Sequence, residues 1–240
     1  MIILVTGGSS GLGEAITRHL AQDVNNTVYF TYNNSLANAK KIEDDFNNAI
    51  AIKCDFKNEH EVKGLTERIA QLAPDVLINN AYFGAFIKSY FHKTPPEDFL
   101  AEFKDNIIPT IVITQAAINV FRKKKNGKII TILTSALLNV PPTGTSIYVA
   151  NKAYLQKMTK VWASENAKYN ITSNTVSPSF MQTTFTQDMD ERIIDQMIEN
   201  HPLKKLLTTQ EVAESVAYLT NASAHVNGID VVINAGTNIQ

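Results

Sequence analysis

The chain opens with the run Met1-Ile2-Ile3-Leu4-Val5-Thr6-Gly7-Gly8-Ser9-Ser10-Gly11-Leu12-Gly13. The apolar residues 2–5 indicate a short buried strand, the glycines after them a tight turn, and the amphipathic residues 14–21 a helix. Such a turn lets backbone amides approach a pyrophosphate, and the helix presents its free N–H groups to the same anion. The run therefore predicts the first strand, turn and helix of a dinucleotide-binding sheet, although a tight turn without a ligand has the same pattern.

The alternation of strand and helix continues along the chain. Further strands are predicted at residues 27–32, 49–54, 75–78, 128–133, 171–176 and 229–233, and helices at 37–46, 59–72, 97–122, 145–169 and 210–219, with a possible kink at Pro109. This rhythm is typical of a parallel sheet with crossover helices. We therefore expect a single α/β domain over residues 1–240, with a Rossmann-like, doubly wound, seven-stranded parallel sheet and helices on both faces.

Composition narrows the classes of protein and of partner. The 240 residues are 44% hydrophobic and 19% charged, with a net charge of -1, which fits a globular domain and gives no general attraction to nucleic acid or to a membrane. The single cysteine, Cys54, excludes an intrachain disulfide, and no Cys/His cluster has metal-binding spacing. The opening apolar run is too short for a signal peptide or a membrane span, so a cytoplasmic protein without a metal is expected.

The end of the second predicted strand bears on the choice of cofactor. An acidic residue at this point of a dinucleotide fold binds the ribose 2′-hydroxyl and repels a 2′-phosphate. This chain instead has the neutral Asn33, Asn34 and Ser35, followed by Lys40 and Lys41. The pattern favours NADPH over NADH, while an ordinary polar loop is the alternative.

Two apolar segments follow predicted strands. Residues 82–91 are rich in aromatic side chains, which suits a substrate wall, internal packing or a subunit contact. Residues 179–207 form a longer excursion, and its flexible apolar side chains suit a lid over an apolar substrate or helix packing: Phe180, Met181, Phe185, Met189 and Met197.

The segment Thr145-Ser146-Ile147-Tyr148-Val149-Ala150-Asn151-Lys152 contains the candidate catalytic pair. On a helix, Tyr148 and Lys152 lie on one face about a turn apart. A cation beside a phenol favours the phenolate and lowers its pKa, which gives an acid or base usable near neutral pH. The same spacing also occurs on ordinary amphipathic helices.

Taken together, the ordered motifs resemble the short-chain dehydrogenase/reductase family over nearly the whole chain. The residues that carry the resemblance are Thr6-Gly7-x-x-x-Gly11-x-Gly13, Asp55, Asn79-Asn80-Ala81, Asn106, Ser135, Tyr148-x-x-x-Lys152 and Pro178 to Thr183. The resemblance implies that Tyr148 exchanges a proton with the substrate oxygen while the nicotinamide transfers a hydride. It also implies that Ser135 binds that oxygen, that Lys152 binds the nicotinamide ribose and lowers the pKa of Tyr148, and that Asn106 holds a water.

The resemblance implies a cofactor site as well. Its expected residues are Gly7, Ser9, Ser10, Gly11, Leu12, Gly13, Asn33, Asn34, Ser35, Asp55, Phe56, Asn80, Ala81, Tyr148, Lys152, Pro178 and Thr183. Two positions depart from the family pattern, because Tyr82 and Ser179 stand where glycine is common. Both departures put the size of the substrate and the geometry of the lid in doubt.

The nearest branch in appearance is that of the 3-oxoacyl-carrier-protein reductases. We therefore expect an NADPH-dependent reductase of a ketone, with a 3-oxoacyl thioester on a carrier protein or CoA as the substrate, and a homotetramer. The alternatives are an NAD-dependent alcohol or sugar dehydrogenase of the same fold and a dinucleotide sensor without turnover. The natural substrate, its chain length and its stereochemistry cannot be derived from the sequence.

Overall fold

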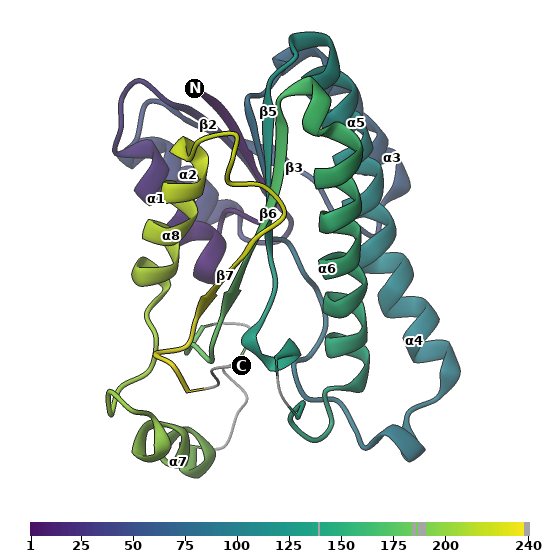
Figure 1. The fold of residues 1–240 in the computed structure, drawn as a ribbon, viewed down its shortest axis with the longest axis vertical. Helices are drawn as coiled ribbons and strands as arrows, with labels where there is room; N and C mark the ends of the chain where they lie inside the picture. Colours follow the sequence, from purple (N-terminus) through teal and green to yellow (C-terminus); the bar gives the residue numbers. More distant parts are fainter. Residues whose placement is uncertain (139, 184–185, 187–190, 238–240) are drawn as a thin grey trace.

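A computed structural model describes residues 1–138, 140–183, 186 and 191–237. They contain one sheet with the strand order β3-β2-β1-β4-β5-β6-β7, in which every neighbouring pair is parallel (Figure 1). The strands are β1 (Ile2–Val5), β2 (Thr27–Tyr32), β3 (Ala49–Lys53), β4 (Val76–Asn79), β5 (Gly127–Ile132), β6 (Ile171–Pro178) and β7 (Asp230–Ile233). The predicted seven-stranded parallel sheet is confirmed.

Helices cover both faces of the sheet. One face carries α1 (Gly11–Ala21), α2 (Leu36–Asp45) and α8 (Thr209–Asn221), and the other carries α3 (Glu59–Leu72), α4 (Pro96–Glu102), α5 (Ile108–Lys124) and α6 (Ser146–Asn166) (Figure 1). The described residues also contain short 3₁₀ turns at Phe91–Lys93, Ser135–Leu137 and Ala167–Tyr169, and the helix α7 (Glu191–Asn200).

The alternation of side chains along β1 explains why the core has two layers. Ile3 and Val5 point into a cluster with side chains of α1, α2 and α8, whereas Leu4 points into the cluster with α3, α5 and α6. A parallel strand buried on both faces reads as a continuous apolar run, which is the pattern that the opening residues show. Because the strand order reverses between β1 and β4, a crevice is expected at their carboxyl ends.

The predicted kink at Pro109 is placed differently in the structure. A π-helical turn, Phe103–Ile107, separates α4 from α5, and Pro109 lies in the first turn of α5. The three segments are contiguous, so Pro109 lies inside one long helical stretch and cannot donate to the carbonyl of residue 105. A proline at this point agrees with an irregular helix, and the irregularity takes the form of the π turn just before it.

The segment expected to form a lid contains α7, which lies beyond the carboxyl ends of the strands (Figure 1). Phe185 and Met189 lie outside the described residues. Within the described ranges, no helix is long and apolar enough to cross a bilayer. Those ranges also hold no cluster of three or more His, Cys, Asp and Glu side chains arranged to bind a metal.

Candidate active site

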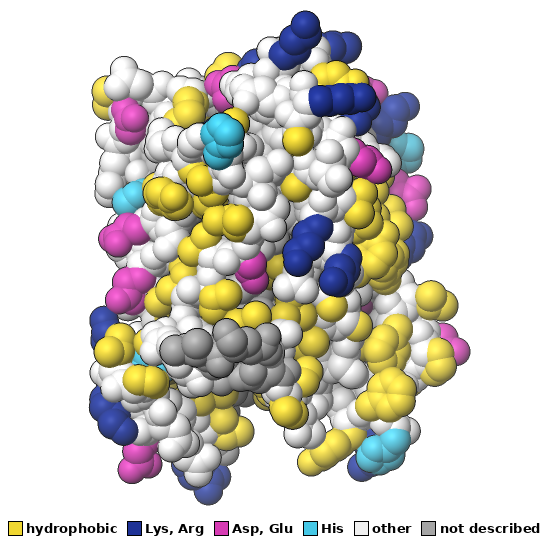
Figure 2. Space-filling view, viewed as in Figure 1, with side chains coloured by type: hydrophobic (Ala, Val, Ile, Leu, Met, Phe, Trp, Pro, Cys, Tyr) yellow, Lys and Arg dark blue, Asp and Glu magenta, His cyan; other side chains and the backbone are white. Residues whose placement is uncertain are grey.

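A cavity of about 890 Å³ lies at the carboxyl ends of the strands. Figure 2 shows the molecule hollowed at its lower edge, with hydrophobic side chains on both sides of the hollow. Of the expected cofactor residues, those that line the cavity are Gly7, Ser9, Ser10, Gly11, Leu12, Gly13, Asn33, Asn34, Ser35, Asn80, Ala81, Tyr148, Lys152, Pro178 and Thr183. The fold therefore brings residues from most of the chain to one site.

The glycine turn is held against the end of β4. The Asn80 side-chain amide donates to the backbone oxygens of Thr6 (3.0 Å) and Gly7 (3.1 Å), and the Thr6 hydroxyl accepts from the backbone N–H groups of Asn80 and Ala81. Gly7 has a φ of 65°, which L side chains rarely adopt. These hydrogen bonds fix the position of the turn at the edge of the cavity.

The beginning of α1 fits an anion. A Cβ on Gly13 would lie 2.0 Å from the Gly7 oxygen, so only glycine allows the helix to start this close to the turn. The N-cap residue, Ser10, makes no side-chain hydrogen bond to the first amides of the helix. Exposed N–H groups and the positive end of the helix dipole at this position suit the pyrophosphate of a dinucleotide.

Outside the lining of the cavity, at its end near β2, a lysine that the sequence prediction missed is bonded to a lining residue. Lys53, the last residue of β3, donates from Nζ to Oδ1 of Asn33 (2.9 Å) and also contacts Glu61 (3.3 Å). Lys40 and Lys41 are exposed on α2 and do not line the cavity. The pairing of Asn33 with Lys53 follows from the register of two neighbouring strands, which no local spacing indicates.

Two of the expected cofactor residues do not line the cavity. Asp55 accepts from the backbone N–H of Lys57 and donates its own N–H to Glu61, so it shapes the loop before α3. Phe56 is buried, and its ring packs edge-on against that of Phe83. In the described structure both residues support the wall behind the cavity, and a direct cofactor contact has no geometric support.

Tyr148 is held between two aromatic rings. Its ring meets those of Tyr82 and Phe86 edge-to-face, each at a centroid distance of 5.2 Å. Burial raises the pKa of Tyr148 to about 12, and a hydrogen bond with the Thr134 side chain opposes this rise. The direction is opposite to the lowering that was expected from Lys152, because burial is the largest cause of the shift.

Lys152 is buried beside Tyr148 and donates from Nζ to the backbone oxygen of Ile132 (2.8 Å). Burial lowers its pKa to about 7. Its Nζ lies 5.7 Å from the centroid of the Tyr148 ring. Lys152 is the only Lys, Arg, Asp or Glu among the described residues that line the cavity.

The Thr134 side chain, next to the expected Ser135, forms a hydrogen bond with Tyr148, and the role of Ser135 stays a prediction. Both residues follow β5 and line the cavity, but Ser135 begins a 3₁₀ turn that Thr134 caps by accepting from the Ala136 N–H. The only sequence signal was the presence of two adjacent hydroxyl side chains after a strand. That signal does not say which of them points at the phenol.

Asn106 lies in the π turn and outside the cavity lining. Its amide nitrogen donates to the backbone oxygens of Phe83 (2.9 Å) and Glu102 (3.0 Å), and its Oδ1 accepts from the Phe83 N–H (2.6 Å). Both amide hydrogens are thus used to hold the segment after β4 against the helix. The geometry shows this structural role and gives no support to the expected water-binding role.

The apolar side of the cavity comes from two segments. Phe180, Met181 and Met197 of the expected lid line it, as do Phe83 and Phe86 of the aromatic segment. For these residues the position in the lining agrees with one of the alternatives, an apolar wall, and their role towards a substrate stays a prediction.

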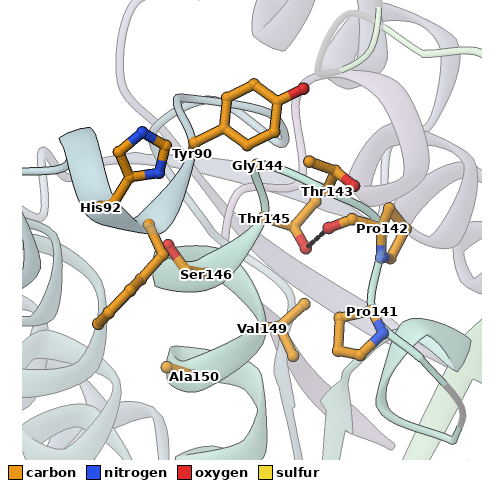
Figure 3. Close-up of a pocket in the computed structure, with 11 residues that line it drawn as sticks. Tyr90, His92, Pro141, Pro142, Thr143, Gly144, Thr145, Ser146, Val149 and Ala150 are labelled. Atoms are coloured by element: carbon orange, nitrogen blue, oxygen red, sulfur yellow. Dashed lines mark hydrogen bonds between the residues drawn. The ribbon is translucent and has the colours of Figure 1, made fainter.

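A second, largely apolar cavity of about 600 Å³ lies on the other side of residues 141–145 (Figure 3). Its lining comes from Tyr90–His92, from residues 141–146 and from the first turn of α6. Thr145 donates its hydroxyl to the Pro142 oxygen (2.6 Å), which shapes the loop between the two cavities. Pro142 lines both of them.

Comparison with known proteins agrees with this geometry. A family model described as Enoyl-(Acyl carrier protein) reductase matches residues 7–238. Carbonyl reductase family member 4 of Xenopus laevis is 30% identical over 239 residues, which cover 98% of this chain and 97% of the relative. The 3-oxoacyl-[acyl-carrier-protein] reductase of Bos taurus is 29% identical over 238 residues, which cover 98% and 97%.

A similar solved structure is a short-chain dehydrogenase from Burkholderia cenocepacia J2315 in complex with NADP. It superposes with a TM-score of 0.85 and 28% identity, and the match covers 99% of this chain and 97% of the other. Because both the family model and the relatives span nearly the full length, the chain belongs to the short-chain dehydrogenase/reductase family and is an oxidoreductase.

Proposed function

We propose that this chain uses NADPH to reduce the ketone of a 3-oxoacyl thioester, carried on CoA or on an acyl carrier protein, to a secondary alcohol. The observation that carries the proposal is the meeting of the Tyr148 phenol, the Thr134 hydroxyl and Lys152 in the cavity that the glycine turn also lines. The names of the relatives that act on acyl carriers support this choice of substrate class.

Each of these residues has its own role in the proposed reaction. NADPH supplies the hydride, which leaves negative charge on the carbonyl oxygen of the substrate. The Tyr148 phenol donates its proton to that oxygen, and the Thr134 hydroxyl stabilises the developing charge by a hydrogen bond. The ammonium of Lys152 stabilises the phenolate that Tyr148 leaves. A phenol whose pKa is raised to about 12 stays protonated at neutral pH and is ready to donate.

The preference for NADPH is supported by the polar end of the cavity. No carboxylate occurs among its described lining residues, and behind them Lys53 is bonded to the lining residue Asn33 and paired with Glu61. A cation and neutral amides tolerate a 2′-phosphate, whereas a carboxylate repels one. Titration of the protein with each reduced cofactor tests this, and Lys53→Ala should weaken NADPH binding more than NADH binding. Tighter binding of NADH by the parent protein would overturn the cofactor assignment and favour the NAD-dependent alternative.

Turnover is tested by following NADPH oxidation with a 3-oxoacyl-CoA and with the 2-enoyl-CoA of the same chain length. We expect activity with the ketone, and activity with the enoyl thioester alone would replace the proposed reaction by reduction of a carbon–carbon double bond. Tyr148→Phe should lower the rate by about 10²-fold or more, the range for a positioned proton donor. Tyr154→Phe is the matched control, since Tyr154 lies on the same helix and is absent from the cavity lining. Cofactor binding without turnover on any carbonyl would favour the sensor alternative.

A homo-oligomer, and specifically a tetramer, stays part of the proposal. Apolar side chains on α4, α5 and α6 are exposed, including Leu100 (72%) and Ile108 (44%). The edge strand β7 also exposes Val232. Exposed apolar side chains on two separate faces suit two kinds of subunit contact. Light scattering at micromolar concentration tests this, and a monomer would contradict it.

A further inference from the structure

Tyr82, the residue that departs from the family pattern, contacts both members of the catalytic pair. It follows β4 and lines the cavity. The Lys152 ammonium lies 5.0 Å from the centroid of its ring, within the range of a cation–π interaction. The Tyr148 ring meets the Tyr82 ring at 85°. One side chain therefore offers a ring to the proton donor and to the cation beside it.

The ring of Tyr82 is fixed by its hydroxyl. That hydroxyl donates to Oε2 of Glu102 (3.2 Å) and accepts from Nδ2 of Asn151 (3.2 Å). Glu102 is nearly buried, and its other oxygen accepts from Nζ of Lys88 (3.1 Å). Asn151 lies on α6 between Tyr148 and Lys152, so the anchor is tied to the helix that carries the catalytic pair.

Lys152 depends on this ring for stabilisation of its charge. Its ammonium is buried and donates to the Ile132 oxygen, and no salt bridge to a carboxylate is found for it within the described part of the chain. A cation–π interaction is strongest when the cation is desolvated. The Glu102 carboxylate accepts from the Tyr82 hydroxyl and from the Lys88 ammonium, so these two groups engage its charge.

We infer that Tyr82 is a positioning residue of the reaction, whose anchored ring orients the Tyr148 phenol and stabilises the charged form of the Lys152 side chain. The inference rests on the proposed function, in which Lys152 must be charged to stabilise the Tyr148 phenolate. The titratable groups around this ammonium are Tyr148 on α6, Tyr82 after β4, and Glu102 on α4 with its partner Lys88. Reduction should therefore lose activity as the pH rises through the pKa of Lys152.

The experiment compares Tyr82→Leu and Tyr82→Met, which remove the aromatic face, with Tyr82→Phe, which keeps it and loses only the anchor. Methionine fills irregular space well, so it serves as the second variant if leucine prevents folding. In both non-aromatic variants we expect kcat to fall about tenfold and the alkaline limb of its pH profile to move down by about one pH unit. In Tyr82→Phe the alkaline limb of the pH profile should lie at the same pH as in the parent, and kcat should fall less than about threefold. KM for the thioester should change little in all three variants.

A second readout does not need turnover. The difference in Tm between Tyr82→Phe and Tyr82→Leu should be larger at about pH 6, where Lys152 is charged, than at about pH 9, where it is neutral. A parent protein that reduces no carbonyl but shows this Tm pattern would refute the proposed function alone. The role of the ring would be refuted if the Tm values of Tyr82→Phe and Tyr82→Leu changed equally with pH. It would also be refuted if Tyr82→Leu kept the kcat of the parent and the alkaline limb of its pH profile.

Discussion

Substitution of Gly13 tests the proposal that the glycine turn is rigid and binds the cofactor. In Gly13→Ala the new methyl would lie 2.0 Å from the Gly7 oxygen and 2.5 Å from Nδ2 of Asn80, far inside van der Waals contact. Both atoms belong to the hydrogen-bonded turn, so either the start of α1 or the turn must shift by more than about 1 Å. Overpacking of this kind costs about 3 kcal/mol. For a chain of this size that corresponds to a fall in Tm of about 6–12 °C.

Gly64 is the matched control, because it lies in α3 and a Cβ there would meet nothing within 4 Å. Gly64→Ala should raise the stability by about 0.5–1 kcal/mol, since alanine is the better helix former. Circular dichroism melts measure both variants, and fluorescence titration measures the Kd for NADPH. We expect Gly13→Ala to weaken NADPH binding by about 50-fold or more and Gly64→Ala to leave it unchanged. A Gly13→Ala protein with the parent's Tm and Kd would refute the reasoning, because the turn would then be soft.

Two further predictions concern the site, and a third concerns a buried thiol of the core. Thr134→Val should lower kcat by about 10²-fold, because the loss of a hydrogen-bond donor to the developing oxyanion is costly. Thr134→Ser and Ser135→Ala should each lower kcat less than about fivefold. A larger loss of kcat in Ser135→Ala than in Thr134→Val would assign the role to Ser135. The pKa of Lys152 is lowered to about 7 from 10.5, so the folded chain binds fewer protons than the unfolded chain between these values and stability rises with pH across that window. Lys152→Met removes this dependence of stability on pH, so the Tm of the variant should exceed that of the parent by more at about pH 6 than at about pH 10. An equal difference in Tm at both pH values would show that the ammonium is solvated. Burial raises the pKa of the Cys54 thiol to about 12, so a disulfide reagent should modify the native protein about 10²-fold or more slowly than the unfolded protein, and rapid native labelling would contradict its burial.

The sequence was sufficient for the sheet and for the glycine turn, because both depend on local patterns. The apolar run of β1 alternates between two core layers, and the glycines at positions 7 and 13 are required by a backbone angle and a close approach within the same turn. Such constraints act between residues close in the chain. They can therefore be predicted without knowledge of the tertiary structure.

The details that the sequence could not supply depend on contacts between distant residues. Pro109 indicated an irregular helix, but the bonds of Asn106 to Phe83, 23 residues away, could not be predicted from it. Lys53 meets Asn33 only because β2 and β3 are neighbours in register. Which hydroxyl faces Tyr148 depends on the direction in which the chain leaves β5. None of these contacts is indicated by the residues that are close to it in the sequence.

The burial of Lys152 links the stability of the site to its chemistry. A buried ammonium with a pKa near 7 is charged only in part at neutral pH, and holding that charge lowers the stability of the fold. Each group that favours the charged form, namely the Ile132 oxygen and the ring of Tyr82, therefore stabilises the fold and, in the proposed reaction, the phenolate of Tyr148 as well. Glycine at position 82 would offer no such ring. In this chain the pH range of activity should therefore depend on a residue that exchanges no proton with the substrate.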